Sequence, residues 1–315
     1  MGAALPTGGF VAGFLISSGL GGLAGLALGG LLAWVLQGRR RRRTARRQAA
    51  LALPFPEAWR TFLRDRYDHF ERLPEALRRR FEDDLRLFLL DKRITGVGVE
   101  VTDELRILTA ASAVTLSLGW PDYEWDQLTE VLLYPQEFDR DYGFEGGRSA
   151  ELDEEGRPPE PELAGLAHPW GTVILSVPSL LEGFEDPDDG FHVGLHEFAH
   201  LLEVDRSQIG GIPMGLTGER ARAWVGAATR EMERLVREGQ ERETRRKRGR
   251  RRELASAFDP YGDQDPVEFL AVAIEAFFEA SLAVRQQHRE IYDLLADYFG
   301  QDPAGWDDAR GLVLD

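Results

Sequence analysis

The chain has 315 residues, of which 43% are hydrophobic, enough for one large domain or two small ones with a packed core. It contains no cysteine, so disulfides and thiolate metal sites are excluded, and any metal must be held by histidine and carboxylate. The net charge is −16, and seven arginines fall within residues 39–47. The remainder carries 31 basic and 54 acidic residues, a net −23, and this acidic balance argues against a nucleic-acid-binding surface.

The N-terminal segment has the properties of a membrane span. Residues 1–38 contain no charged side chain, and Phe10 to Leu36 is an apolar, glycine-rich run of 27 residues. A helix of that length covers about 40 Å, more than the roughly 30 Å of a bilayer's hydrocarbon core. Because basic residues stay on the cytoplasmic side, the arginines that follow predict a single-pass inner-membrane protein whose body lies in the cytoplasm.

Two other interpretations of this segment are possible from its length and composition. A cleaved signal peptide has a basic start and a small-residue cleavage site, and residues 1–38 have neither. A buried core helix is the other alternative, but such helices rarely run this long without a charge. Gly21, Gly25 and Gly29 form a doubled G-x-x-x-G pattern that can bring two membrane helices into a homodimer, although glycine is common in membrane helices anyway.

The soluble body follows a basic linker. Residues 39–56 end in two prolines, Pro54 and Pro56, which stop a continuous helix, and residues 57–315 form the predicted domain. Hydrophobic periodicity predicts helices at 57–92 (in two pieces broken near Leu73-Pro74), 103–118 (capped by Thr102), around His196, and at 218–253, 265–280 and 285–299. Strands are predicted at 130–135 and 171–177, a strand or loop at 94–101, and a long surface loop at 139–169. This order predicts a mainly helical α+β domain with a small sheet.

Residues 194–203 carry an H-E-x-x-H motif within an apolar helical segment. His196 and His200 are four apart, so on a helix they lie on one face and can place two imidazole nitrogens on one metal ion. Glu197 lies beside them, where it can take a proton from a metal-activated water, as in the zincins. The alternative is two helical histidines that are packed or solvated for their own sake.

A hydrolytic zinc site keeps three protein ligands and one open position, so a third ligand is needed. The predicted helix 265–280 is apolar enough to be buried, yet it carries Glu268, Glu275 and Glu279. A buried carboxylate is costly unless it is paired or bound to a metal. Helix geometry alone does not choose among them, since seven residues rotate by about 700°, nearly two full turns. The position of Glu268 in the first turn favours it as the ligand.

Tyr261 and His192 are two further candidates for the site. Tyr261 lies in a turn just before this helix and is a candidate hydrogen-bond donor to the developing oxyanion, or simply a surface tyrosine. His192 is four residues before His196, but it falls at the helix start and is expected to be a bystander.

The basic run from Arg242 to Arg252 is interpreted as a solvated charged face, with a contact to anionic lipid as the alternative.

Several motifs occur together in a recognisable order between about residues 60 and 305: Tyr134-Pro135, Asp189-Gly190, His196-Glu197-Phe198-Ala199-His200, Tyr261, Pro266-Val267-Glu268-Phe269, Glu275-Ala276-Phe277-Phe278 and Gln301-Asp302-Pro303. In these the chain resembles the MtfA family of zinc-dependent peptidases, named for titrating the repressor Mlc, and its catalytic part is similar to the C-terminal domain of anthrax lethal factor. The family usually has aspartate where Glu203 stands here.

The resemblance implies a zincin-type domain with Zn2+ on His196, His200 and Glu268, with Glu197 as general base and Tyr261 as oxyanion donor. It also implies a peptide or protein substrate and a cytoplasmic transcriptional regulator as partner. The founding family member is soluble, so the membrane helix is an addition here. We therefore expect a membrane-anchored zinc peptidase. The alternatives are a membrane protein that mainly sequesters a regulator, with peptidase activity secondary, and a metal-free scaffold.

Overall fold

The computed structural model describes residues 29, 33–138, 163–168, 171–185, 191–203, 210–247, 258 and 265–309. The predictions made for residues 1–28, for the loop at 139–162 and for Tyr261 fall outside these residues. The chain divides into two compact units, Met1–Pro54 and Phe55–Asp315.

In the first unit, residues 33–51 are helical, and the helix ends before Pro54, where the prolines were expected to stop it. Within the described residues, none of the helices combines the length and the apolar character that crossing a membrane requires. Most of the predicted membrane segment, Phe10 to Leu36, lies outside the part of the chain that is described.

The second unit contains a four-stranded mixed sheet, in the order β1 (Arg93–Gly96), β2 (Glu130–Tyr134), β4 (Thr172–Ser176), β3 (Gly165–Ala167). The first three strands run parallel, and β3 pairs antiparallel to β4 at the edge. The apolar runs in β2 and β4 fit strands that are largely buried. Strand β3 lies within the range expected to be a loop, so that expectation was wrong at 165–167: three residues are too few to show the alternation that marks a strand.

Helices make up most of the unit, which confirms the mainly helical α+β prediction: α2 (Glu57–Arg66), α3 (Asp68–Arg72), α4 (Glu75–Asp91), α5 (Asp103–Ser117), α6 (Val177–Glu182), α7 (Val193–His200), α8 (Gly218–Lys247), α9 (Pro266–Glu279), α10 (Ser281–Gln287), α11 (Arg289–Phe299) and α12 (Pro303–Ala309). The break predicted near Leu73-Pro74 is confirmed, since it separates α3 from α4. The number of pieces was wrong, because Tyr67 is extended and also separates α2 from α3. The single helix predicted at 285–299 is likewise divided, at His288.

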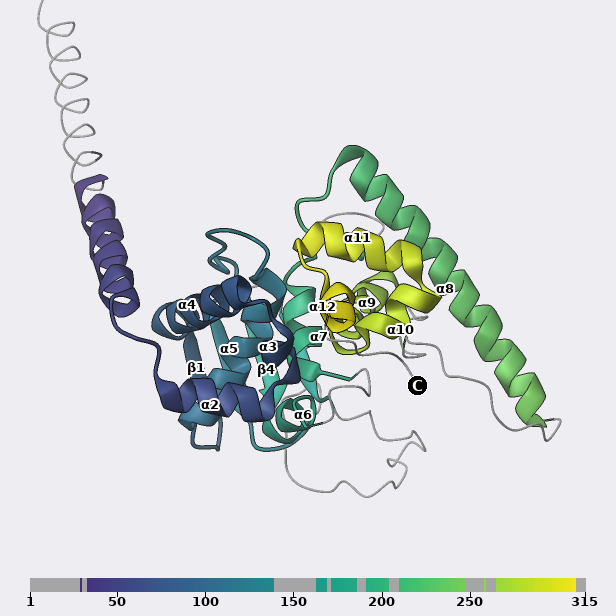
Figure 1. Ribbon diagram of the computed structural model, residues 1–315, viewed down its shortest axis with the longest axis horizontal. Coiled ribbons are helices and arrows are strands. Elements are labelled where there is room, and N and C mark those ends of the chain that lie inside the picture. Colours follow the sequence, from purple (N-terminus) through teal and green to yellow (C-terminus); the bar gives the residue numbers. More distant parts are fainter. Residues whose placement is uncertain are drawn as a thin grey trace, which may run out of the picture. The chain divides into compact units, whose positions relative to one another are not determined.

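Helix α7 lies at the centre of the unit, where it packs against α5, the β3–β4 edge of the sheet and α9 (Figure 1). Thr102 caps α5 by accepting the Leu105 N–H at 3.3 Å, as predicted. The approach of α7 to α5 is close, because a Cβ atom on Gly194 would lie 2.2 Å from Ser112 Oγ. Glycine at 194 thus lets the histidine-bearing helix lie directly on α5.

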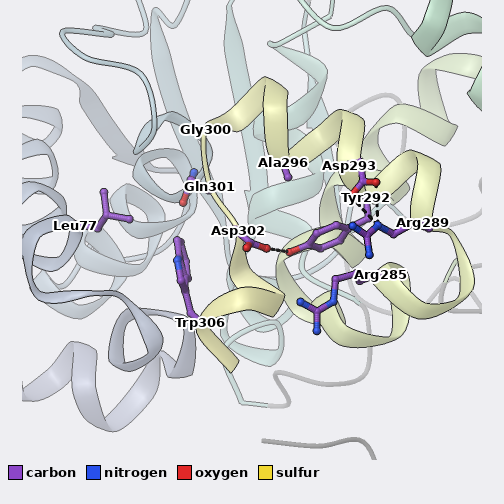
Figure 2. Close-up of a pocket in the computed structure, with 10 residues that line it drawn as sticks. All are labelled: Leu77, Arg285, Arg289, Tyr292, Asp293, Ala296, Gly300, Gln301, Asp302 and Trp306. Atoms are coloured by element: carbon purple, nitrogen blue, oxygen red, sulfur yellow. Dashed lines mark hydrogen bonds and ion pairs between the residues drawn. The ribbon is translucent and has the colours of Figure 1, made fainter. Parts of the chain in front are cut away.

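The Gln301-Asp302-Pro303 motif fastens the C-terminal helices to the core. Gln301 Nε2 donates to the Thr115 carbonyl of α5 at 2.8 Å, and Tyr292 donates its hydroxyl to Asp302 Oδ1 at 2.5 Å. Figure 2 shows Tyr292 directed at Asp302 in a pocket of about 490 Å³ between α11 and α12, with Arg285 and Trp306 at its wall. None of the predicted site residues lines this pocket, so the Gln301-Asp302-Pro303 motif has a structural role.

Candidate metal centre

The start of α7 is built by His192. Its ring is buried, and Nδ1 accepts the Leu195 N–H at 3.3 Å, so the imidazole acts as the helix N-cap. Burial lowers the pKa of His192 to about 3, which keeps the ring neutral and able to accept. Its backbone N–H donates to Glu275 Oε1. His192 therefore stands outside the metal group and ties α7 to α9.

The structure brings His196, His200 and Glu268 together, with one potential ligand atom of each within 4.8 Å of the others. Glu268 Oε2 lies 3.3 Å from His196 Nε2, and its Oε1 lies 3.9 Å from His200 Nε2. The three side chains are 17%, 16% and 25% exposed, so one side of the group faces solvent. Two imidazoles and one carboxylate with an open side fit a catalytic zinc site, and the described residues contain no second group of this kind.

The first turn of α9 sets the position of Glu268. Asp265 caps this helix, since its Oδ1 accepts the N–H groups of Val267 and Glu268 at 2.7 and 3.0 Å. Pro266 occupies the first helical position, where a missing N–H costs nothing. The cap leaves Glu268 at the helix start, where its side chain reaches the histidines while the following turns are buried.

Glu275 meets the opposite edge of the His196 ring. Its side chain is 4% exposed, and its Oε2 lies 3.2 Å from His196 Nδ1. This contact orients the ring with Nε2 towards Glu268, as carboxylates do for metal-bound histidines. Burial acts to lower the pKa of His196, but Glu268 and Glu275 outweigh it and hold that pKa well above its usual value. The same negative surroundings would favour a divalent cation.

Glu197 projects towards the sheet edge. A Cβ atom on Gly165 would lie 2.4 Å from Glu197 Cγ, so the backbone of β3 passes directly beside this carboxyl group. Burial raises the pKa of Glu197 to about 7; His196 and a hydrogen bond from the Ala167 backbone oppose the shift, and the charges of Glu268 and Glu275 reinforce it. Glu197 Oε2 is buried without a hydrogen-bond partner among the described residues. Such a carboxyl group is suited to exchange a proton near neutral pH.

The other predicted residues lie apart from this group or outside the described chain. Tyr261 is not among the described residues, so its role stays a prediction. Glu279 is buried near Tyr67, and its charge adds to the effect of burial in raising the pKa of Tyr67. His288, which is not a predicted site residue, pairs with Glu231 at 2.9 Å. Sequence reasoning missed the approach of β3 to Glu197, for which Gly165 was the one signal, since glycine within a strand marks close backbone contact.

Acid should destabilise the fold through His192. Its pKa is about 3 when folded and about 6.5 when exposed, so between these values the unfolded state binds a proton that the folded state does not. Stability is therefore lost as pH falls from about 6.5 towards 3, by up to about 1.4 kcal/mol per pH unit. His192→Asn keeps a capping side chain but removes the titration.

Chemical unfolding of both proteins at pH 7, 6 and 5 measures this difference. The free energy of unfolding of His192→Asn should fall less steeply with acid. Equal slopes for the two proteins would show that His192 is not a source of acid lability.

Comparison with known proteins identifies the family. The model of the glucose-regulated metallo-peptidase M90 family matches residues 39–300. The chain is 30% identical over 255 residues to an uncharacterised protein of Synechocystis sp., covering 79% of this chain and 86% of that relative. It is 27% identical to Mlc titration factor A of Cronobacter sakazakii and to that of Escherichia fergusonii, covering in each case 69% of this chain and 76% of the relative. Because the family match spans most of the sequence and includes His196, His200 and Glu268, the chain belongs to the M90 metallopeptidase family.

Proposed function

We propose that this protein hydrolyses peptide bonds with a zinc ion held by His196, His200 and Glu268. The observation that carries the proposal is the group of three ligand atoms within 4.8 Å of one another. Glu197, with its unpartnered buried Oε2, adjoins it. When bound, zinc supplies the Lewis acidity that makes water nucleophilic near neutral pH.

Glu197 performs the proton transfers in this mechanism. It takes the proton of the attacking water and passes it to the leaving amine, a role that needs a carboxyl group able to lose and regain a proton near neutrality. The raised pKa of Glu197, about 7, supports that role. Glu275 holds the His196 ring in place during the reaction through Nδ1.

The edge strand supports a peptide as substrate. Strand β3 is the last in the described sheet order and passes beside Glu197. The outer side of an edge strand offers backbone N–H and C=O groups to an extended chain, which is how many proteins bind peptides. A peptide aligned along β3 would carry its scissile carbonyl past the metal group.

Tyr261 is proposed as the oxyanion donor on the strength of the family resemblance and of its place seven residues before Glu268. Tyr261→Phe removes only the hydroxyl. Undiminished hydrolysis by this variant would remove the assignment.

Metal removal tests the proposed function. The purified full-length protein, assayed against a peptide library, should cleave peptides, lose this activity with a zinc chelator and regain it when zinc is restored. Activity that survives complete metal removal would contradict the proposal. The second candidate, sequestration of a transcriptional regulator, rests on the names of two relatives, the Mlc titration factors. It would be favoured if no peptide is cleaved while a regulator binds tightly.

We also propose that residues 1–38 anchor the protein in the inner membrane with the catalytic unit in the cytoplasm. The uncharged segment and the seven arginines after it support this topology. A reporter fused after Asp315 should be active only in the form that functions in the cytoplasm. Activity of a periplasm-specific reporter would reverse the assignment.

A further inference from the structure

The segment after α7 is tied to a second stretch of chain through Glu203, three residues beyond His200. Glu203 Oε1 accepts the Gly211 N–H at 2.7 Å. Beside this bond, the Met214 N–H donates to the Leu202 carbonyl at 2.6 Å, and Glu203 forms an antiparallel bridge with Pro213. Residues 210–214 are therefore held against the end of the histidine-bearing helix.

The same stretch lies against the start of α9. Gly211 has a φ of +61°, and a Cβ atom there would lie 1.9 Å from the Pro266 carbonyl oxygen. Gly210 has a φ of +66°, and a Cβ atom there would lie 3.1 Å from Val267 Cγ2. Glycine is required at 211 both for its left-handed backbone and for this contact. The two residues touched, Pro266 and Val267, immediately precede Glu268.

Helix α8 also binds Gly211, through the Gly211 carbonyl group. Trp224 of α8 is 1% exposed, and its Nε1 donates to the Gly211 carbonyl at 2.7 Å. The Trp224 ring also faces Phe269 of α9, with ring centroids 6.4 Å apart. Gly211 thus gives its N–H to the Glu203 carboxylate and its C=O to the indole, while its Cα packs on Pro266. Both of its hydrogen-bonding groups are fixed.

We propose that Glu203 is a positioning residue that fixes Glu268 relative to His196 and His200. This inference rests on the metal site of the proposed function. The carboxylate links the end of α7 to Gly211, and Gly211 sets how closely the first turn of α9 approaches. Without the carboxylate, the Gly211 N–H loses its partner and the contact with Pro266 loosens. Glu268 would then sit further from the histidines, and the metal would bind more weakly.

Zinc affinity of the full-length protein, measured by competition with a chelator, tests this role. Glu203→Ala should weaken zinc binding by about 10- to 100-fold, the range typical when a group supporting a ligand is lost. Glu203→Gln should keep affinity to within about tenfold, since its amide oxygen can still accept the Gly211 N–H. Gly211→Ala should reproduce the Glu203→Ala loss, because the new methyl group must displace the start of α9.

Glu231→Ala is the matched control. It removes a carboxylate that ties α8 to His288, so it should lower the free energy of unfolding and leave zinc affinity unchanged. Wild-type affinity in Glu203→Ala, or an equal loss in Glu231→Ala, would overturn the proposal. Should Glu203→Ala fail to fold, Trp224→Phe removes the other hydrogen bond to Gly211 and keeps an aromatic, though smaller, side chain. Unchanged zinc affinity in that variant would also overturn the proposal. Zinc binding without peptide hydrolysis would refute the proposed function alone.

Discussion

Replacing Glu197 with glutamine should lower the rate of peptide hydrolysis by at least about 100-fold while the protein keeps its zinc. Glutamine has nearly the same shape but cannot take a proton from water. Shape matters here because the β3 backbone at Gly165 leaves no room beside the carboxyl group. The kcat/KM for a cleaved peptide, together with the zinc content of the same preparation, measures the effect.

Glu182→Gln provides a control for the loss of one negative charge, since Glu182 is exposed at the end of α6. This control should retain the wild-type rate. If Glu197→Gln hydrolyses peptides as fast as the wild-type protein, Glu197 is not the general base. If Glu197→Gln loses zinc as well as activity, the Glu197 carboxyl group contributes to metal binding, and its role is not limited to proton transfer.

Sequence reasoning identified most of the α7 and α9 architecture because strong local signals mark it. The apolar face of α7, the H-E-x-x-H spacing and the Asp265-Pro266 start of α9 each depend on neighbours in the chain. The same is true of Thr102 as the cap of α5. Such features are fixed by spacing along one helix, so one sequence suffices to find them.

Features that depend on tertiary contacts were not predictable in this way. The extended residue Tyr67 interrupts a helical pattern that is continuous in hydrophobicity. Its ring is buried, and its hydroxyl lies 2.7 Å from Thr115 Oγ1 on α5. The sequence likewise does not predict the histidine N-cap of α7, because His192 can accept a hydrogen bond as a cap only where burial keeps its ring neutral.

The choice between Glu268 and Glu275 shows the same limit. Both carboxylates lie on one side of α9, since they are nearly two full turns apart, so periodicity leaves them equivalent. The crossing of α9 over α7 separates them. One approaches Nε2 of His196 at 3.3 Å and the other Nδ1 at 3.2 Å, and only the first also reaches His200. This crossing depends on packing between distant segments and has no signature within either helix.

Zinc affinity of Glu268→Ala and Glu275→Ala, measured side by side by chelator competition, tests the central claim most directly. Removing a ligand should strip the metal, so Glu268→Ala should lose zinc as fully as His196→Ala, which serves as the reference for a lost ligand. Removing the carboxylate that orients His196 should weaken binding by about 10- to 100-fold and leave a measurable site. A larger loss in Glu275→Ala than in Glu268→Ala, or wild-type zinc affinity in Glu268→Ala, would contradict the metal centre described here.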